Sequence, residues 1–95
     1  MIKVIAQFNL KAGNAEKAKM LCADLVKATR EEKGCIQYDL LQDKNDENIM
    51  VILENWASQE DLDEHYLSDH FLDIVPKLAD LCVELPKVNM FEQII

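Results

Sequence analysis

Apolar and polar side chains alternate along the first segment of the chain, with Ile5 as the one exception. The positions that would share one face of a strand are Ile2, Val4, Ala6, Phe8 and Leu10. Because successive side chains of a strand point to opposite faces, this period of two predicts a half-buried strand over residues 2–10.

The period lengthens after Gly13. Asn14 can cap a helix by accepting hydrogen bonds from free backbone N–H groups. From Ala15 onward the apolar residues fall on one helical stripe: Ala18, Leu21, Cys22, Leu25 and Val26. Gly34, after Glu31-Glu32-Lys33, would supply a left-handed stop. We therefore predict one amphipathic helix between Asn14 and Gly34.

Two strands joined by a polar turn follow. Residues 35–42 place Ile36, Tyr38 and Leu40 on one side, and residues 43–48 are all polar. The first half of residues 49–56 is apolar on both faces, which is typical of a central strand covered on both sides. The pattern predicts a hairpin with a long turn.

A second helix is predicted from Ser58, which can cap it, with Glu60 and Asp61 near the positive end of its dipole. Pro76 has no N–H to donate, so we expect residues 69–75 to form one piece and Pro76 to open another reaching Leu81. Residues 87–94 would form a last strand at an edge.

The resulting order, β-α-β-β-α-β, predicts an α+β fold: a ferredoxin-like split unit with an antiparallel sheet, as one domain over residues 1–95. Its helices would cover one face of the sheet. Ile5 and alternate residues of the third strand would lie on the other face, where a monomer would expose them to water. Because exposed apolar sheet faces are usually interfaces, we predict a homodimer packed sheet to sheet.

The charge and the cysteines narrow the function classes. The net charge is −8 and the pI about 4.6, with no run of Lys or Arg, so nucleic-acid and membrane-surface partners are not expected. Cys22, Cys35 and Cys82 form no C-x-x-C spacing, which indicates neither a redox dithiol nor a zinc knuckle. With no signal-peptide pattern and no apolar run of about 20 residues, a reduced cytoplasmic protein is expected.

Candidate chemistry gathers in residues 54–71, which hold the only Trp and both His of the chain. Asn55 and Trp56 alternate along a strand, so at most one of them would face a pocket. His70 lies five residues after His65, about 140° around an ideal helix, so the pair is poorly placed to share a metal ion. No metal site is predicted, and His70 is expected to have a structural role in a helix bend.

The pattern Glu54-x-Trp56-x-Ser58-x5-Glu64-His65-x4-His70-Phe71 resembles the antibiotic biosynthesis monooxygenase (ABM) family of small quinol-monooxygenase-like proteins. The early strand, Gly34 and Pro86 also fall where that family places them. The resemblance implies a dimeric α+β barrel, in which two ferredoxin-like sheets pack together.

The resemblance also implies insertion of oxygen from O2 into a small quinol, phenol or polyketide-type aromatic, without metal, flavin or other cofactor. A neutral His suits proton abstraction, and ring N–H and O–H groups suit stabilisation of the anion. The expected catalytic residues are His65, as base or anion stabiliser, and Trp56. The expected substrate-binding residues are Tyr38, Asn55, Phe71 and His70.

Three other functions are compatible with this family resemblance, and the sequence does not favour them equally. Haem-degrading members rely on an Asn, a Trp and a His where this chain has Ala6, His65 and Val75, which disfavours haem degradation. An isomerase of a phosphorylated signalling sugar would need cations, and only Lys77 and Lys87 are near. A dimer that binds a small molecule without turning it over is the third alternative.

Overall fold

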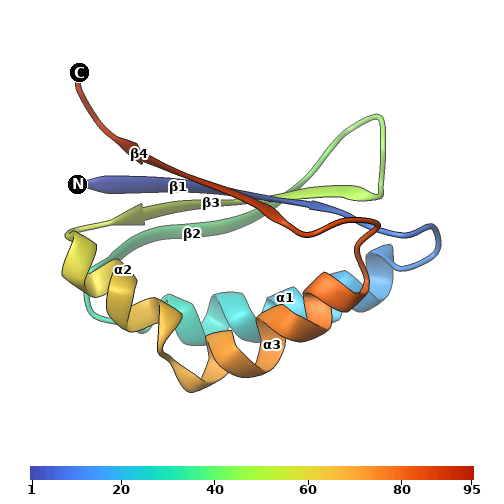
Figure 1. Cartoon of the computed structure of the whole chain (residues 1–95), viewed down its shortest axis with the longest axis horizontal. Helices are drawn as coiled ribbons and strands as arrows, with labels where there is room; N and C mark the ends of the chain where they lie inside the picture. Colours follow the sequence, from blue (N-terminus) through green and yellow to red (C-terminus); the bar gives the residue numbers. More distant parts are fainter.

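The computed structural model describes all 95 residues and has two layers, a four-stranded sheet with helices on one face only (Figure 1). The elements are β1 (Ile2–Asn9), α1 (Ala15–Thr29), β2 (Cys35–Gln42), β3 (Ile49–Trp56), α2 (Gln59–Tyr66), α3 (Asp69–Asp80) and β4 (Lys87–Glu92). All strand pairs are antiparallel, in the order β2-β3-β1-β4. The predicted α+β class and ferredoxin-like order are confirmed.

The place of each strand in the sheet follows its apolar pattern. β3, apolar on both faces in its first half, is central between β2 and β1, and β4 is an edge strand, as predicted. The alternating residues of β1 point toward the helices, where Val4, Ala6 and Phe8 are buried. β2 departs from its pattern, because a bulge between Cys35 and Gln37 interrupts the alternation and leaves Ile36 54% exposed.

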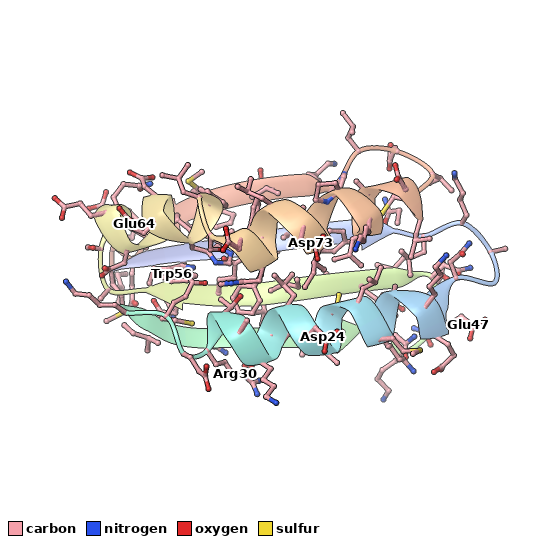
Figure 2. All side chains as sticks on the ribbon, turned by 90° about the horizontal axis from the view of Figure 1, so that it is seen from below. Asp24, Arg30, Glu47, Trp56, Glu64 and Asp73 are labelled. Carbon is pink, nitrogen blue, oxygen red and sulfur yellow. The ribbon has the colours of Figure 1, made fainter.

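The helices form two neighbouring rows beneath the sheet, with α1 in one row and α2 followed by α3 in the other (Figure 2). The predicted stripe of α1 packs into the core through Ala18, Cys22 and Leu25. The second row adds Leu62, Ile74 and Leu78. Full burial of each large aliphatic side chain contributes about 1.5–3 kcal/mol before entropy is subtracted.

Both ends of α1 differ from the prediction. Asn14 does precede the helix, but its amide Nδ2 donates to the carbonyl oxygens of Lys11 and Ala12, so its side chain does not cap the helix. The helix ends at Thr29, earlier than expected. Gly34 has the predicted left-handed conformation, with φ of 81°, but its carbonyl accepts from Ala57 N–H, so the turn leads into β2 rather than ending α1.

The break in the second helical segment lies at Leu67–Ser68, and the prediction of a break at Pro76 is wrong. Ser68 caps α3 by accepting a hydrogen bond from Phe71 N–H, so the new helix starts there. Pro76 sits inside α3, where it removes one backbone donor. Burial of Ile74 and Leu78 on either side of it keeps the helix on the core.

The second face of the sheet carries no helix (Figure 1). The strand register places Ile5 of β1 opposite Leu53 of β3 on that face, with Val51 beside them and Phe91 at the β4 edge. The predicted apolar content of this face is therefore confirmed. Among the helices, none has the length and apolar character needed to cross a membrane.

Candidate active site

A small, partly open cavity lies between the sheet and the helices. Its volume is about 50 Å³. The lining residues are Ala6, Phe8, Leu25, Tyr38, Ile52, Glu54, Tyr66, Phe71, Val75, Pro86 and Val88. Ligand pockets usually measure about 300–1,000 Å³, so an aromatic substrate would need the surrounding side chains to move apart. Glu54 is the only charged residue in the lining.

Glu54, near the end of β3, is buried and hydrogen-bonded. It is 7% exposed, and Trp56 Nε1 donates to its Oε1 over 2.9 Å. The two side chains meet because residues two apart on a strand share a face. Burial raises the pKa of Glu54 to about 7, and the hydrogen bond from Trp56 partly opposes this rise.

His65 lies near the end of α2 and is fully buried among aromatic rings. Its ring centroid is 4.8 Å from that of Trp56, 5.1 Å from Phe71 and 5.4 Å from Tyr38. His65 Nδ1 lies 2.7 Å from Glu32 Oε2, whereas His65 Nε2 has no hydrogen-bond partner. Burial lowers the pKa of His65, and the Glu32 carboxylate opposes this less strongly.

These contacts indicate which ring nitrogen of His65 carries the proton. A neutral imidazole carries one proton, and a carboxylate oxygen 2.7 Å from Nδ1 holds that proton on Nδ1. Nε2 then presents a lone pair inside an aromatic enclosure. This arrangement is that of a histidine oriented by a carboxylate, with the opposite nitrogen able to accept a proton.

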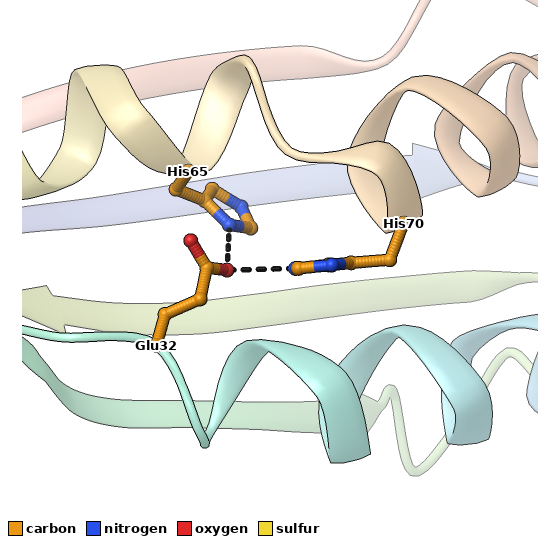
Figure 3. A group of neighbouring side chains, drawn as sticks. All are labelled: Glu32, His65 and His70. Carbon is orange, nitrogen blue, oxygen red and sulfur yellow. Dashed lines mark hydrogen bonds and ion pairs between the residues drawn. The ribbon is translucent and has the colours of Figure 1, made fainter.

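Both histidines contact the same carboxylate oxygen (Figure 3). His70 Nε2 lies 2.8 Å from Glu32 Oε2, and the two imidazole centroids are 6.1 Å apart. The expectation that helical spacing would separate the histidines is therefore wrong. It assumed a continuous helix, whereas the chain turns between α2 and α3 at Leu67–Ser68.

Glu32 was not predicted as a site residue. It lies in the short connection between α1 and β2, next to two other charged residues. No local pattern distinguishes it from its neighbours Glu31 and Lys33, because its role depends on contacts with residues more than 30 positions away.

The six predicted site residues do not all line the cavity. Tyr38 and Phe71 line the cavity, whereas His65, Trp56, Asn55 and His70 are not part of its lining. Asn55 pairs with Lys3 and Gln37 on the helix-free face of the sheet. The alternation of Asn55 and Trp56 is thus as expected, with Trp56 on the helix side.

Tyr66 is a lining residue that the sequence did not bring forward. Its hydroxyl is buried and has no hydrogen-bond partner. Burial raises its pKa to about 12, and burial also raises the pKa of Tyr38 above its usual range. Both phenols are therefore neutral at physiological pH and can act as O–H donors toward a negatively charged ligand.

With this geometry described, the chain can be compared with known proteins. The sequence profile of the family named "Antibiotic biosynthesis monooxygenase" matches residues 1–77. The chain belongs to the antibiotic biosynthesis monooxygenase family, which confirms the resemblance inferred from residues 54–71.

Individual relatives are distant. The chain is 32% identical over 81 residues to the Bacillus subtilis protein named "Putative monooxygenase YcnE", covering 85% of each. It is 25% identical over 91 residues to an uncharacterized Synechocystis protein, of which it spans 62% of the length. A crystal structure named "antibiotic biosynthesis monooxygenase" superposes with a TM-score of 0.95 at 32% identity, covering 100% of both chains.

Proposed function

We propose that this protein is a cofactor-independent monooxygenase that acts on a small quinol, phenol or polyketide-type aromatic. A base removes a proton from the substrate hydroxyl, and the resulting anion passes one electron to O2. The two radicals combine, forming a C–O bond and, after protonation, a hydroperoxide. Loss of water then leaves a carbonyl, so one oxygen atom enters the product and the other enters water. The substrate supplies all the electrons.

The observation that carries this proposal is the state of His65. Its Nδ1 lies 2.7 Å from Glu32 Oε2, and its Nε2 is buried without a partner. Its ring packs against those of Tyr38 and Phe71, which line the cavity. A neutral imidazole oriented in this way suits general-base catalysis. We propose His65 as the base, with Glu32 as a positioning residue that sets its tautomer.

The lining of the cavity supports an aromatic substrate. Tyr38, Tyr66 and Phe71 offer ring faces and two hydroxyl donors, and Trp56 supports the wall by binding Glu54. Apolar walls that exclude bulk water would protect the radical intermediates. The absence of Lys and Arg from this lining weighs against the phosphorylated sugar that the isomerase alternative requires.

We further propose that residues 1–95 act as one domain and that two copies pair through their helix-free sheet faces into an α+β barrel. The apolar side chains of Ile5, Val51, Leu53 and Phe91 support this arrangement. Sedimentation at micromolar concentration should give twice the chain mass of 10.9 kDa. A stable monomer at that concentration would contradict the dimer.

The activity is tested by measuring oxygen uptake with a panel of quinols, using protein stripped of metal ions. Wild-type protein should consume O2 in step with substrate, and His65→Ala should slow turnover by about 100-fold, the usual loss for an acid–base group. Asp63→Asn, on the exposed surface of α2, is the matched control and should retain wild-type turnover.

Two outcomes would replace the proposal. Substrate conversion that continues unchanged in an oxygen-free chamber would indicate an isomerase. Tight binding of the aromatic with no oxygen uptake would indicate a protein that only binds it. Unchanged turnover in His65→Ala would remove His65 from the mechanism.

A further inference from the structure

Three side chains from separate parts of the chain converge at one point. Glu32 comes from the connection after α1, His65 from α2 and His70 from the first turn of α3. One ligand-type atom from each lies within 4.8 Å of the other two (Figure 3). Two imidazoles and a carboxylate form a common ligand set for zinc and neighbouring transition metals.

The directions of the rings favour a shared point of binding. His65 Nδ1 and His70 Nε2 aim at the same atom, Glu32 Oε2, over 2.7 and 2.8 Å. Ligands of one ion also aim their lone pairs at a common point, and tetrahedral ligand atoms bound at about 2.0–2.2 Å from zinc are about 3.3–3.6 Å apart. Small movements of the Glu32 and His70 side chains would therefore open room for an ion next to His65 Nδ1.

The mobility and access needed for such a movement differ among the three residues. The His65 side chain is 1% exposed and held between aromatic rings, whereas those of Glu32 and His70 are 16% and 21% exposed. His65 is thus a fixed ligand, and the other two can adjust around it. Ser68 Oγ, 3.2 Å from His70 Nε2, or a water molecule is available for a fourth position.

Acidic surfaces flank the cluster on both sides. One depression is lined by Glu32, Lys33, Glu60, Asp61 and Glu64. A second depression contains His70 together with Asp24, Asp69, Asp73 and Lys77. Figure 2 places Asp24, Glu64 and Asp73 on the helical side of the molecule. Carboxylates that outnumber cations at both approaches raise the local concentration of a divalent cation.

We propose that Glu32, His65 and His70 form a binding site for a divalent transition-metal ion of the Zn²⁺ type. Coordination through His65 Nδ1 requires the ring proton to move to Nε2. Metal binding would then convert Nε2 from a proton acceptor into a donor. If His65 is the base, as in the proposed function on which this consequence rests, the bound ion suppresses that activity.

The site is tested without substrate, so its outcome does not depend on the proposed activity. Metal-free full-length protein is titrated with ZnCl2 by calorimetry, and with Co²⁺ by visible absorption, which reports ligand geometry. One ion should bind per chain. His70→Ala and Glu32→Gln should each weaken binding by about 100-fold or more, since even loss of an outer-shell partner costs 10–100-fold.

Two matched control variants distinguish metal binding at this site from binding to surface carboxylates or to a cysteine. Glu64→Gln removes a carboxylate from the acidic surface but no proposed ligand, and it should change affinity by about fivefold at most, as expected for an exposed charge. Cys35→Ser removes the one cysteine that is not buried and should leave binding unchanged. Binding that is lost in Cys35→Ser, or that survives both His70→Ala and Glu32→Gln, would overturn the proposal.

Nitrogen NMR of the histidine rings supplies an independent readout. In metal-free protein the His65 ring should carry its proton on Nδ1, and one equivalent of Zn²⁺ should move it to Nε2. His70→Ala should abolish this change at the same zinc concentration. A His65 ring whose nitrogen signals do not respond to zinc would refute its role as a ligand.

Discussion

Replacing Glu54 by Gln should change how the stability of this protein depends on pH. Glu54 is 7% exposed, and its pKa is raised to about 7 from an ordinary value of 4.5. Gln has nearly the same shape and keeps an oxygen that can accept from Trp56 Nε1, but it cannot ionise. The substitution therefore removes the cost of burying a negative charge while retaining the hydrogen bond.

The sign and size follow from proton linkage. Because the folded state binds the Glu54 proton more tightly than the unfolded state, stability is greatest below pH 4.5 and falls as the pH rises toward 7. Each pH unit by which a pKa moves is worth about 1.4 kcal/mol, so the loss across this window is about 3 kcal/mol. Glu54→Gln should be close to wild type at pH 4.5 and about 3 kcal/mol more stable at pH 8.

The assay is urea unfolding followed by the fluorescence of Trp56, the only tryptophan. Protein concentration is kept constant, because any self-association makes apparent stability depend on it. Glu60→Gln, an exposed position at the start of α2, is the matched control, because it removes one surface carboxylate and leaves the buried pair of Glu54 and Trp56 intact.

Only the difference between variant and wild type is interpreted, since other groups titrate equally in both. A Glu54→Gln variant that is less stable than wild type at pH 8 would refute the reasoning. A difference that is constant between pH 4.5 and 8 would show that Glu54 ionises in the folded protein as readily as in the unfolded chain.

Three further substitutions test two local features. Gly34→Ala and Gly13→Ala both place a side chain at positive φ, which costs about 1–2 kcal/mol. At Gly34 the added Cβ would also collide with the side chain of Asp61, whereas the space at Gly13 is open. Thermal unfolding should therefore show the larger loss for Gly34→Ala, and equal losses would contradict the predicted collision. Trp56→Phe removes the hydrogen bond to Glu54. It should destabilise the folded protein by about 1.5–3 kcal/mol at pH 8, where the carboxylate is charged, and by less at pH 4.5. Chemical unfolding at the two pH values measures this difference, and an equal loss at both would count against it.

The fold was predictable wherever local patterns and core burial agree. The alternation in β1, the stripe on α1 and the doubly apolar first half of β3 identified the elements and the central place of β3 in the sheet. The prediction failed at Pro76, because a local rule about proline was outweighed by burial of Ile74 and Leu78. It also placed the end of α1 too late, at Gly34.

The candidate site was predictable only in part. The rare residues of one segment, Trp56 and His65, do lie together in the fold, with ring centroids 4.8 Å apart. Glu32 was missed because a single glutamate in a charged connection carries no periodic or motif signal. The turn between α2 and α3 brings His65 and His70 to Glu32. A helical-wheel argument over residues 65–70 assumes a continuous helix and cannot predict this.

The sequence by itself determined the α+β order, the helix-covered and helix-free faces of the sheet and the family to which the chain belongs. These properties follow from the period of hydrophobic residues and from one short motif, both of which are local. Only the tertiary structure decided that His65 and His70 share the carboxylate of Glu32, and that Glu54 is buried against Trp56. Such contacts depend on where helices stop and how layers pack, and that is settled by the free energy of the whole core.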